Sequence, residues 1–261
     1  MKRILITLIL LWSAVAWADL ETGLAAYERG DYTTALREFV PLAGQGNAVA
    51  QYQLGWMYLQ GHGVPQDNRE AVKWFRKAAE QGYADAQTKL GVAYAQGHGV
   101  PQNNRKAVEW FRKAAEQGAA DAQTNLGLMY AQGHGVPQNN QEAVKWFRKA
   151  AERGYADAQT KLGVAYAQGH GVPQDNREAV KWFRKAAEQG ETSAQRNLGL
   201  IYTDGRGVPQ DYVEAYMWYE LAVTQGDGQA RLMRDRLGQL MTPEQIAEAQ
   251  RLSRNRRPFQ P

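Results

Sequence analysis

The sequence predicts an all-α protein, built as a solenoid of antiparallel helix pairs. A segment of 36 residues occurs five times, marked by Gly-His-Gly-Val-Pro-Gln starting at Gly61, Gly97, Gly133 and Gly169 and by a variant starting at Gly205. Each copy contains two stretches with apolar residues at helical spacing, separated by this glycine- and proline-containing segment. A period of this length is typical of folds in which each unit buries its apolar face against its neighbours.

The first eighteen residues have the pattern of a Sec-type signal peptide. Lys2 and Arg3 precede an apolar run at residues 4–12, and residues 16–18 form a small-x-small cleavage site before Asp19. The uncharged stretch, residues 4–18, is shorter than the roughly 20 residues that span a bilayer. We therefore expect cleavage rather than an uncleaved anchor, export to the periplasm or the outside of a bacterial cell, and no stable membrane insertion afterwards.

The composition limits the other classes of function. The 261 residues include 31 Lys and Arg and 27 Asp and Glu, a net charge of +4, which falls to +2 without residues 1–18 because these hold two basic residues and no acid. So balanced a charge gives little support to nucleic-acid binding. The chain has no cysteine, so no lipid-carrying cysteine and no disulfide, and its stability must come from packing between repeats.

Residues 46–81 illustrate the predicted helices of one repeat. The first helix is expected at residues 48–60, where Ala50, Leu54 and Tyr58 recur every four positions. The second is expected at residues 68–81, which carry the apolar stripe of an amphipathic helix. Residues 61–66 form the loop between them, since two glycines permit positive φ and a proline cannot continue a helix.

The residue after this loop is expected to cap the second helix. Asp67 lies at the N-cap position with Glu70 three residues later, the pattern of a capping box. The pattern recurs in the other repeats but fails at Asn103, where Lys106 takes the place of the glutamate.

Small and large residues recur at fixed places in the repeat. A glycine follows a leucine in each first helix, where it costs roughly 1 kcal/mol relative to alanine, so a close approach of helices is expected there. We expect five tryptophans of the second helices to be the large partners of these glycines in the core between repeats. The glycines are Gly55, Gly91, Gly127, Gly163 and Gly199, and the tryptophans are Trp74, Trp110, Trp146, Trp182 and Trp218.

The repeats are flanked by segments expected to cap the solenoid. Residues 19–45 predict a shorter helix pair, with a turn at residues 30–32. Residues 226–261 predict a helix at 229–240, a second helix starting with Thr242 as N-cap, and a frayed basic tail at 254–258. The five units between them are 46–81, 82–117, 118–153, 154–189 and 190–225.

The repeated motifs resemble those of the Sel-one-like repeat, a relative of the tetratricopeptide repeat with a longer loop between its helices. They are Ala-x-x-x-Leu-Gly-x-x-Tyr, Gly-x-Gly-Val-Pro-Gln-Asp and Ala-x-x-Trp-Phe-x-x-Ala-Ala, in register over residues 46–225. The resemblance implies a right-handed superhelix with a concave groove that binds proteins, often in bacterial envelopes. Some cysteine-rich relatives are linked to β-lactam binding or hydrolysis, an activity that this cysteine-free chain does not support.

The candidate catalytic and metal-ligating residues do not form a site. The histidines His62, His98, His134 and His170 lie one per loop, with neighbouring loops roughly 10 Å apart, whereas zinc needs ligands within about 2.1 Å of one ion. After the leader only Ser193 and Ser253 remain as serine nucleophiles, and neither lies in a recognised catalytic motif. We expect no enzyme activity, no cofactor and no metal site.

The second helices carry pairs of basic residues, which suggest a second kind of binding partner. Stacked repeats could align these pairs in a ridge that binds an acidic glycan or protein, although a glutamate three to four residues later could neutralise each pair. The pairs are Arg76/Lys77, Arg112/Lys113, Arg148/Lys149 and Arg184/Lys185, and the glutamates are Glu80, Glu116, Glu152 and Glu188.

The candidate binding residues lie where the repeats differ, because core positions repeat while contact positions need not. In tetratricopeptide-like folds the first helix lines the groove, and aromatic side chains dominate binding energy. Trp56 could instead cover the junction with the N-terminal cap. The candidate groove residues are Tyr52, Gln53, Trp56, Lys89, Asn125, Lys161 and Asn197.

Together these observations predict an exported, non-enzymatic scaffold that binds a protein or peptide in its groove. Two alternatives remain at this stage: a glycan-binding envelope scaffold, and a cell-wall or β-lactam-related hydrolase.

Overall fold

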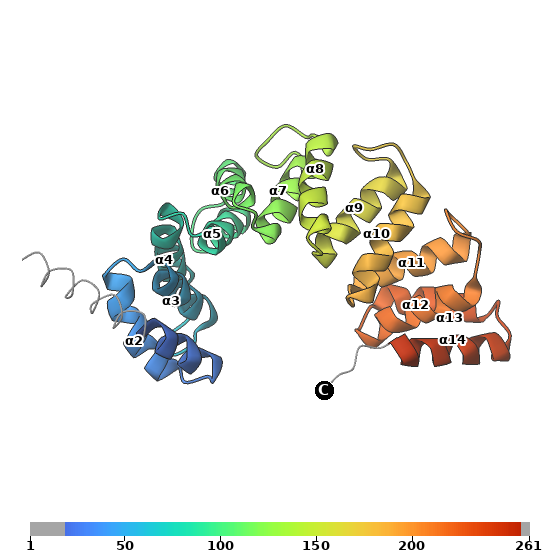
Figure 1. Cartoon of the computed structure of the whole chain (residues 1–261), viewed down its shortest axis with the longest axis horizontal. Helices are drawn as coiled ribbons and strands as arrows, with labels where there is room; N and C mark the ends of the chain where they lie inside the picture. The colour runs from blue at the N-terminus through green and yellow to red at the C-terminus, as the bar shows by residue number, and fades with distance from the viewer. Residues whose placement is uncertain (1–18, 257–261) are drawn as a thin grey trace, which may run out of the picture. The chain divides into compact units, whose positions relative to one another are not determined.

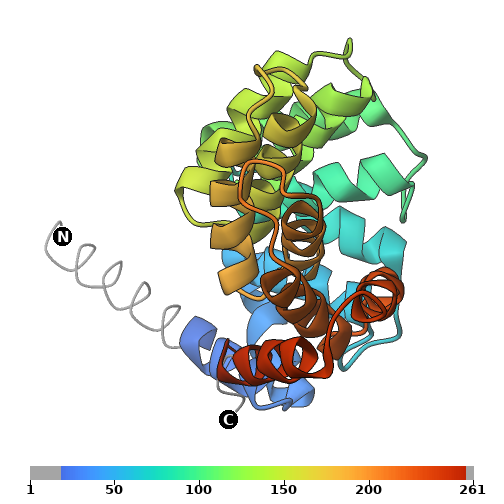
Figure 2. The same cartoon turned by 90° about the vertical axis from the view of Figure 1, so that its right-hand side faces the viewer.

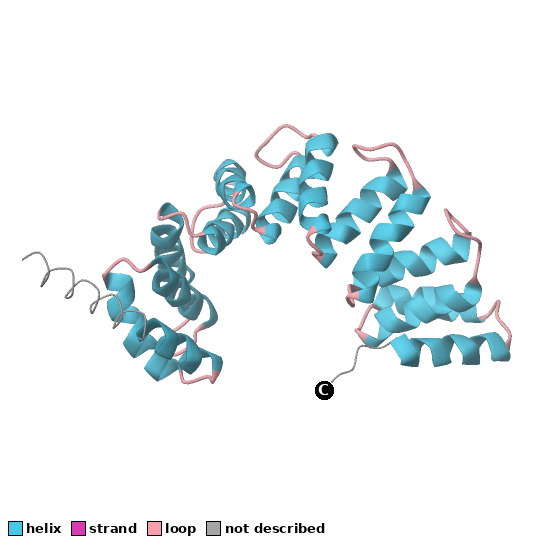
Figure 3. Cartoon of the chain, in the orientation of Figure 1, coloured by secondary structure: helices cyan, strands magenta, loops and turns pink. Residues whose placement is uncertain are grey.

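The computed structural model describes residues 19–256, which form helices joined by turns and loops, with no strand in this range (Figure 3). The first helices of the five repeats are α3 (Ala48–Gln60), α5 (Ala84–Gln96), α7 (Ala120–Gln132), α9 (Ala156–Gln168) and α11 (Thr192–Asp204). The second helices are α4 (Asn68–Glu80), α6 (Asn104–Glu116), α8 (Asn140–Glu152), α10 (Asn176–Glu188) and α12 (Tyr212–Thr224). The predicted α-solenoid of paired helices is confirmed, and the helix bounds of the first repeat agree with the structure to one residue.

The chain divides into two compact units. One contains residues 19–122 with His134–Val136, and the other contains Gln123–Gly133 with residues 137–256. Within the first unit α2 (Tyr32–Gly44) packs on α3, and each following helix up to α6 packs on the one before it (Figure 1). The same order holds from α8 to α12 in the second unit. Each of these helices thus packs on the helices next to it in sequence.

The loop of each repeat donates hydrogen bonds to carbonyls in the last turn of the first helix. Gly61 ends α3 in the left-handed conformation, at φ 74°, and its N–H donates to the Met57 carbonyl. The Gln66 side chain then donates to the Leu59 carbonyl at 2.9 Å. The corresponding glutamines make the same bond in the other four repeats: Gln102, Gln138, Gln174 and Gln210. This explains why glutamine recurs after the proline.

The predicted N-cap is confirmed, but the reciprocal half of the capping box is not formed. The Asp67 carboxylate accepts from the amides of Arg69 and Glu70. The Asp67 N–H, however, donates to the Tyr58 carbonyl at 2.9 Å, so Glu70 has no role there and pairs with Lys73. A basic residue at this position, as in the second repeat, therefore costs no capping bond.

The expected pairing of glycine with tryptophan is wrong, because the neighbouring phenylalanine takes that place. A methyl group on Gly55 would lie 2.6 Å from the Phe75 ring, which is 2 % exposed, so the absence of a side chain lets the ring seat on α3. The same contact recurs in each repeat, with Phe111, Phe147, Phe183 and Tyr219.

The tryptophans lie beside these rings, on a more exposed strip of the second helices. Trp146 and Trp218 are buried, whereas Trp74, Trp110 and Trp182 are half-buried. The tryptophan therefore lies at the solvent-facing edge of the core in three repeats and within the core in the other two.

A buried glutamine joins consecutive repeats, a feature that the sequence analysis did not identify. Gln51 donates to the Ala43 carbonyl and accepts from the Gln81 side chain at 2.7 Å. The same pair of bonds holds Gln87, Gln159 and Gln195. These amides satisfy carbonyls at the ends of helices, where main-chain acceptors lack partners within the helix.

The segments on either side of the repeats are helical. Residues 19–28 form a helix that precedes α2. The helix predicted at residues 229–240 is observed as α13 (Gly228–Gly238). The predicted start of α14 (Pro243–Arg256) is confirmed, since Thr242 and Gln245 exchange hydrogen bonds between side chain and amide. α14 packs on α12 (Figure 2).

The tail expected to fray is ordered as far as the structure describes it. Residues 254–256 complete α14, and the Arg256 guanidinium lies 5.1 Å from the Trp218 ring centroid. The predicted signal peptide, residues 1–18, and residues 257–258 of the tail lie outside the described residues. None of the helices in the described range combines the length and apolar character needed to cross a bilayer.

Candidate binding site

The candidate groove residues lie on the first helices of the repeats, and all seven side chains are half-buried. The structure brings two of them together, because the Lys89 ammonium lies 4.4 Å from the centroid of the Trp56 ring on the preceding first helix. Asn197 is instead tied to its own helix through a bond to the Ser193 carbonyl. The residues are placed as follows: Tyr52, Gln53 and Trp56 on α3, Lys89 on α5, Asn125 on α7, Lys161 on α9 and Asn197 on α11.

Tyr52 belongs to an aromatic cluster at the junction of two repeats. Its ring centroid lies 5.7 Å from that of Phe75 and 5.2 Å from that of Tyr83. Burial, with a smaller contribution from the nearby Asp85 carboxylate, raises the pKa of the Tyr52 phenol to about 12. The ring is therefore held by its neighbours and keeps its proton at physiological pH.

A first cleft opens beside Trp56 and Lys89, in the first unit. It is formed by α3, α4 and α5 together with the loop that follows α5, and its volume is about 170 Å³. Apolar side chains dominate its lining, and Lys89 supplies a cation beside the imidazole of His98. The lining includes Trp56, Asn68, Phe75, Lys89, Ala93 and His98.

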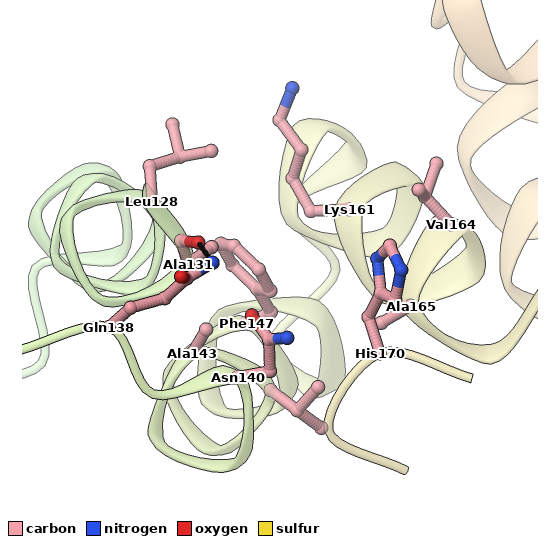
Figure 4. A pocket seen from close by; sticks show the side chains of 11 residues that line it. Leu128, Ala131, Gln138, Asn140, Ala143, Phe147, Lys161, Val164, Ala165 and His170 are labelled. Carbon is pink, nitrogen blue, oxygen red and sulfur yellow. Dashed lines mark hydrogen bonds between the residues drawn. The ribbon is translucent and has the colours of Figure 1, made fainter. Parts of the chain in front are cut away.

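A second cleft of the same construction lies in the second unit, 72 residues further along the chain. Phe147 lies at its centre, with Leu128 on one side, Val164 and His170 on the other, and Lys161 at the edge (Figure 4). Its volume is about 320 Å³. Leu128 stands where the first cleft has Trp56, and the smaller side chain leaves more of the space open.

A small residue at one buried position contributes to the space of both clefts. Ala93 and Ala165 line the two clefts from the second and fourth repeats. The same position holds Met57, Met129 and Ile201 in the other repeats, each at most 6 % exposed. A side chain of that length at Ala93 or Ala165 would extend into the cleft. The sequence shows that this position alternates between a larger residue and alanine, but only the packing shows that alanine leaves a space.

The basic pairs of the second helices find partners different from the expected glutamates. Each lysine lies over the tryptophan of its own helix, with the Lys77 ammonium 4.0 Å from the Trp74 ring centroid. Lys113, Lys149 and Lys185 repeat this contact. The Arg76 guanidinium donates to the Tyr94 hydroxyl of the next repeat, and Arg148 and Arg184 do the same with Tyr166 and Tyr202. These cations therefore help to hold helices and repeats together.

The loop histidines and the serines form no catalytic arrangement with one another. His62 stacks on Tyr32, with centroids 4.3 Å apart, and bonds to the Tyr27 hydroxyl through Nδ1 at 2.9 Å. Ser193 bonds to Glu191 and Ser253 to the Gln250 carbonyl, so neither is paired with a histidine. Across residues 19–256 no three His, Asp or Glu side chains gather as a metal ion would require.

Comparison with known families gives one match that covers most of the chain. The Sel1 repeat model matches residues 48–83, 84–118, 120–155, 156–191 and 192–227. No curated protein matches the chain.

Solved structures with the same repeat resemble this one closely. A protective antigen of uropathogenic Escherichia coli strains with an SLR fold is 39% identical, at a TM-score of 0.87 over 92% of this chain. The alignment covers 53% of that antigen, so the chain spans about half its length. A Sel1 repeat protein from Oxalobacter formigenes is 34% identical, at a TM-score of 0.81, over 93% of this chain and 99% of its own.

Proposed function

Because this chain belongs to the Sel1 repeat family, we propose that it is a non-enzymatic scaffold that binds a protein or peptide along the first helices of its repeats. The observation that carries the proposal is the contact of Trp56 with Lys89 beside an apolar cleft. A half-buried aromatic ring next to a cation provides both an apolar anchor and a charge, the combination that dominates protein interfaces. The other candidate residues are proposed as further contacts, Tyr52 and Gln53 in the first unit and Asn125, Lys161 and Asn197 in the second.

We further propose that the protein is exported and acts in the bacterial envelope or outside the cell. The signal-peptide pattern of residues 1–18 supports this location. The similarity to a protein described as a protective antigen is consistent with it, since an antigen must be reached by the immune system. Intact-mass measurement of the protein from a periplasmic fraction tests the proposal: a chain starting at Asp19 is expected, and a chain that retains residue 2 contradicts it.

The two alternative functions receive less support. The basic pairs that suggested glycan binding have intramolecular partners in the tryptophans and tyrosines of the core. The serines that a hydrolase would use lie apart from the loop histidines, bonded to Glu191 and to the Gln250 carbonyl.

Affinity capture with residues 19–261, from crosslinked envelope extract, tests the scaffold proposal. The parent chain is compared with the double variant Trp56→Ala, Lys89→Ala and with a matched control, Lys145→Ala, Leu232→Ala, at exposed positions away from the clefts. A protein enriched by the parent and the control but lost from the double variant is expected. Enrichment that is equal for all three chains would contradict the proposed surface.

A further inference from the structure

We propose that each of the two clefts is a socket for one apolar side chain of an extended peptide, whose neighbouring carboxylate pairs with Lys89 in one cleft or Lys161 in the other. The inference rests on the proposed scaffold function and adds the chemistry of the partner: an apolar residue next to Asp or Glu. It follows from the size, the charge and the hydrogen-bonding groups of the clefts.

The size of the clefts suits one large apolar side chain. Apolar cavities of roughly 150 Å³ hold a benzene ring, and these clefts measure about 170 and 320 Å³. Their floors are made by Phe75 in one and Phe147 in the other, each flanked by alanine and valine side chains. A phenyl or branched aliphatic group would therefore find apolar contacts on several sides while its main chain remained at the opening.

The charge of the clefts favours a carboxylate. Each lining contains one lysine and one loop histidine, Lys89 with His98 and Lys161 with His170, and neither lining contains an Asp or Glu. Lys89 is oriented by its contact with Trp56. Lys161 lies 3.4 Å from the exposed Asp157, an interaction in high dielectric that a ligand carboxylate can replace at little cost. An anionic group beside the apolar group is thus attracted, and a cationic one is repelled.

A polar atom in the first cleft suits a peptide main chain. Asn68 lines this cleft, and its side-chain oxygen is buried and has no hydrogen-bond partner among the described residues. A buried acceptor without a partner costs free energy that a ligand N–H can recover. The amide of an extended peptide supplies such a donor, and Asn140 stands at the same position in the second cleft.

The sequence repeats these features with a period of two units. The second and fourth repeats carry the lysine and the small alanine, whereas the other repeats carry Gln or Asn and a larger residue at the same positions. A cleft with its own lysine therefore recurs after 72 residues, and each of the two clefts is expected to take an apolar–acidic pair of its own.

The test uses a minimal probe with a phenyl ring and a carboxylate. Saturation-transfer NMR with 3-phenylpropionate and the folded chain of residues 19–261 is compared with 3-phenylpropylamine, the cationic analogue, and 3-phenylpropanol, the neutral one. The carboxylate is expected to bind at least tenfold more tightly than the amine. Equal binding of all three probes would overturn the assignment of an acidic ligand and indicate a purely apolar one.

Two sets of variants locate the probe. Ala93→Met and Ala165→Met place in the clefts a residue that the same position already holds in other repeats, so folding is expected to persist, as circular dichroism will verify. The double variant should lose probe binding, and Lys89→Gln with Lys161→Gln should weaken it about tenfold. Lys145→Gln, on an exposed face outside both clefts, should leave it unchanged.

The outcomes separate this inference from the scaffold proposal. Probe binding that persists in the folded Ala93→Met, Ala165→Met variant would overturn the sockets even if affinity capture finds a partner. Probe binding that is lost in this variant supports the sockets even if capture from envelope extract finds none, and the failure would then belong to the scaffold proposal alone.

Discussion

The second glycine of each loop shows how one residue can be required for two reasons. Gly99 has a φ of 74°, in the left-handed region that favours glycine. In addition, a methyl group on Gly99 would lie 2.5 Å from the Asn68 carbonyl carbon, because the loop of one repeat rests on the first turn of the preceding second helix. Gly135, Gly171 and Gly207 are placed in the same way against Asn104, Asn140 and Asn176.

A pair of glycine variants separates these two reasons. Gly99→Ala should destabilise by about 2–4 kcal/mol, since the left-handed conformation costs about 1–2 kcal/mol and the overlap with Asn68 adds a similar amount. Gly82→Ala should cost only the free energy of the left-handed conformation. Gly82 also has a positive φ, 91°, but no atom lies within 4 Å of the added methyl group. Urea unfolding followed by circular dichroism measures both, and equal midpoints for the two variants would contradict the loop contact.

Tyr52 gives a pH dependence that can be measured. Burial raises the pKa of the Tyr52 phenol from 10.0 to about 12, so the unfolded chain releases this proton at lower pH than the folded chain. Stability from this group is therefore complete below pH 10 and is lost as the pH rises through 12. In Tyr52→Phe, the unfolding midpoint should fall less steeply between pH 10 and 12 than in the parent. Tyr155→Phe, at an exposed tyrosine, should follow the parent, and a parent slope equal to that of Tyr52→Phe would refute the assignment.

At the scale of the elements, the junction between two repeats combines apolar packing with buried amides. Gln159, 3 % exposed, bonds to the Ala151 carbonyl at the end of α8 and to the Gln189 side chain beyond the end of α10. The side chain thus connects three helices of consecutive repeats. An apolar residue at this position would remove one of two bonds from each partner, since the Ala151 carbonyl also accepts from the Gly154 amide and the Gln189 side chain also donates to the Lys185 carbonyl.

Replacing Gln159 by leucine measures the contribution of this link. Gln159→Leu should destabilise by about 1–3 kcal/mol, because the Ala151 carbonyl and the Gln189 amide lose a buried partner. Gln174→Leu removes a hydrogen bond that is exposed to water and should cost less than about 1 kcal/mol. Chemical denaturation of both variants tests the difference, and an equal loss would mean that the buried amide contributes no more than an exposed one.

At the scale of the whole molecule, contacts are local along the chain. In each compact unit a helix packs chiefly on the helices before and after it, so stability is close to a sum over repeats and their interfaces. Nothing in this arrangement requires a fixed number of repeats, provided that each junction joins matching surfaces.

Deletion of two repeats tests this additivity. Removing residues 84–155 joins Tyr83 to Ala156, the same dipeptide that Tyr155 and Ala156 form in the parent. The shortened chain should keep its helical content per residue and unfold cooperatively at a lower denaturant midpoint. Deletion of residues 84–137 breaks the register and should abolish cooperative unfolding. If both deletions unfold alike, folding depends on contacts beyond neighbouring repeats.

The sequence by itself determined the repeat, the helix bounds within it and the N-cap residues of the second helices. These features depend on interactions over a few residues: glycine at positive φ, the N-cap carboxylate at Asp67, and apolar residues at helical spacing. Because such interactions are local and recur five times, the pattern that encodes them is visible in the printed letters. The proposal of the first helices as the binding surface has a different basis, the resemblance to tetratricopeptide-like folds and the positions at which the repeats differ.

Only the tertiary structure decided which side chains meet. Phe75 rather than Trp74 packs on Gly55, because the way α4 crosses α3 decides which side chain of α4 faces the glycine. The clefts likewise depend on packing, since Ala93 and Ala165 create a space only where two repeats and a loop meet. Contacts between residues far apart in the sequence depend on how surfaces fit, which periodicity does not specify.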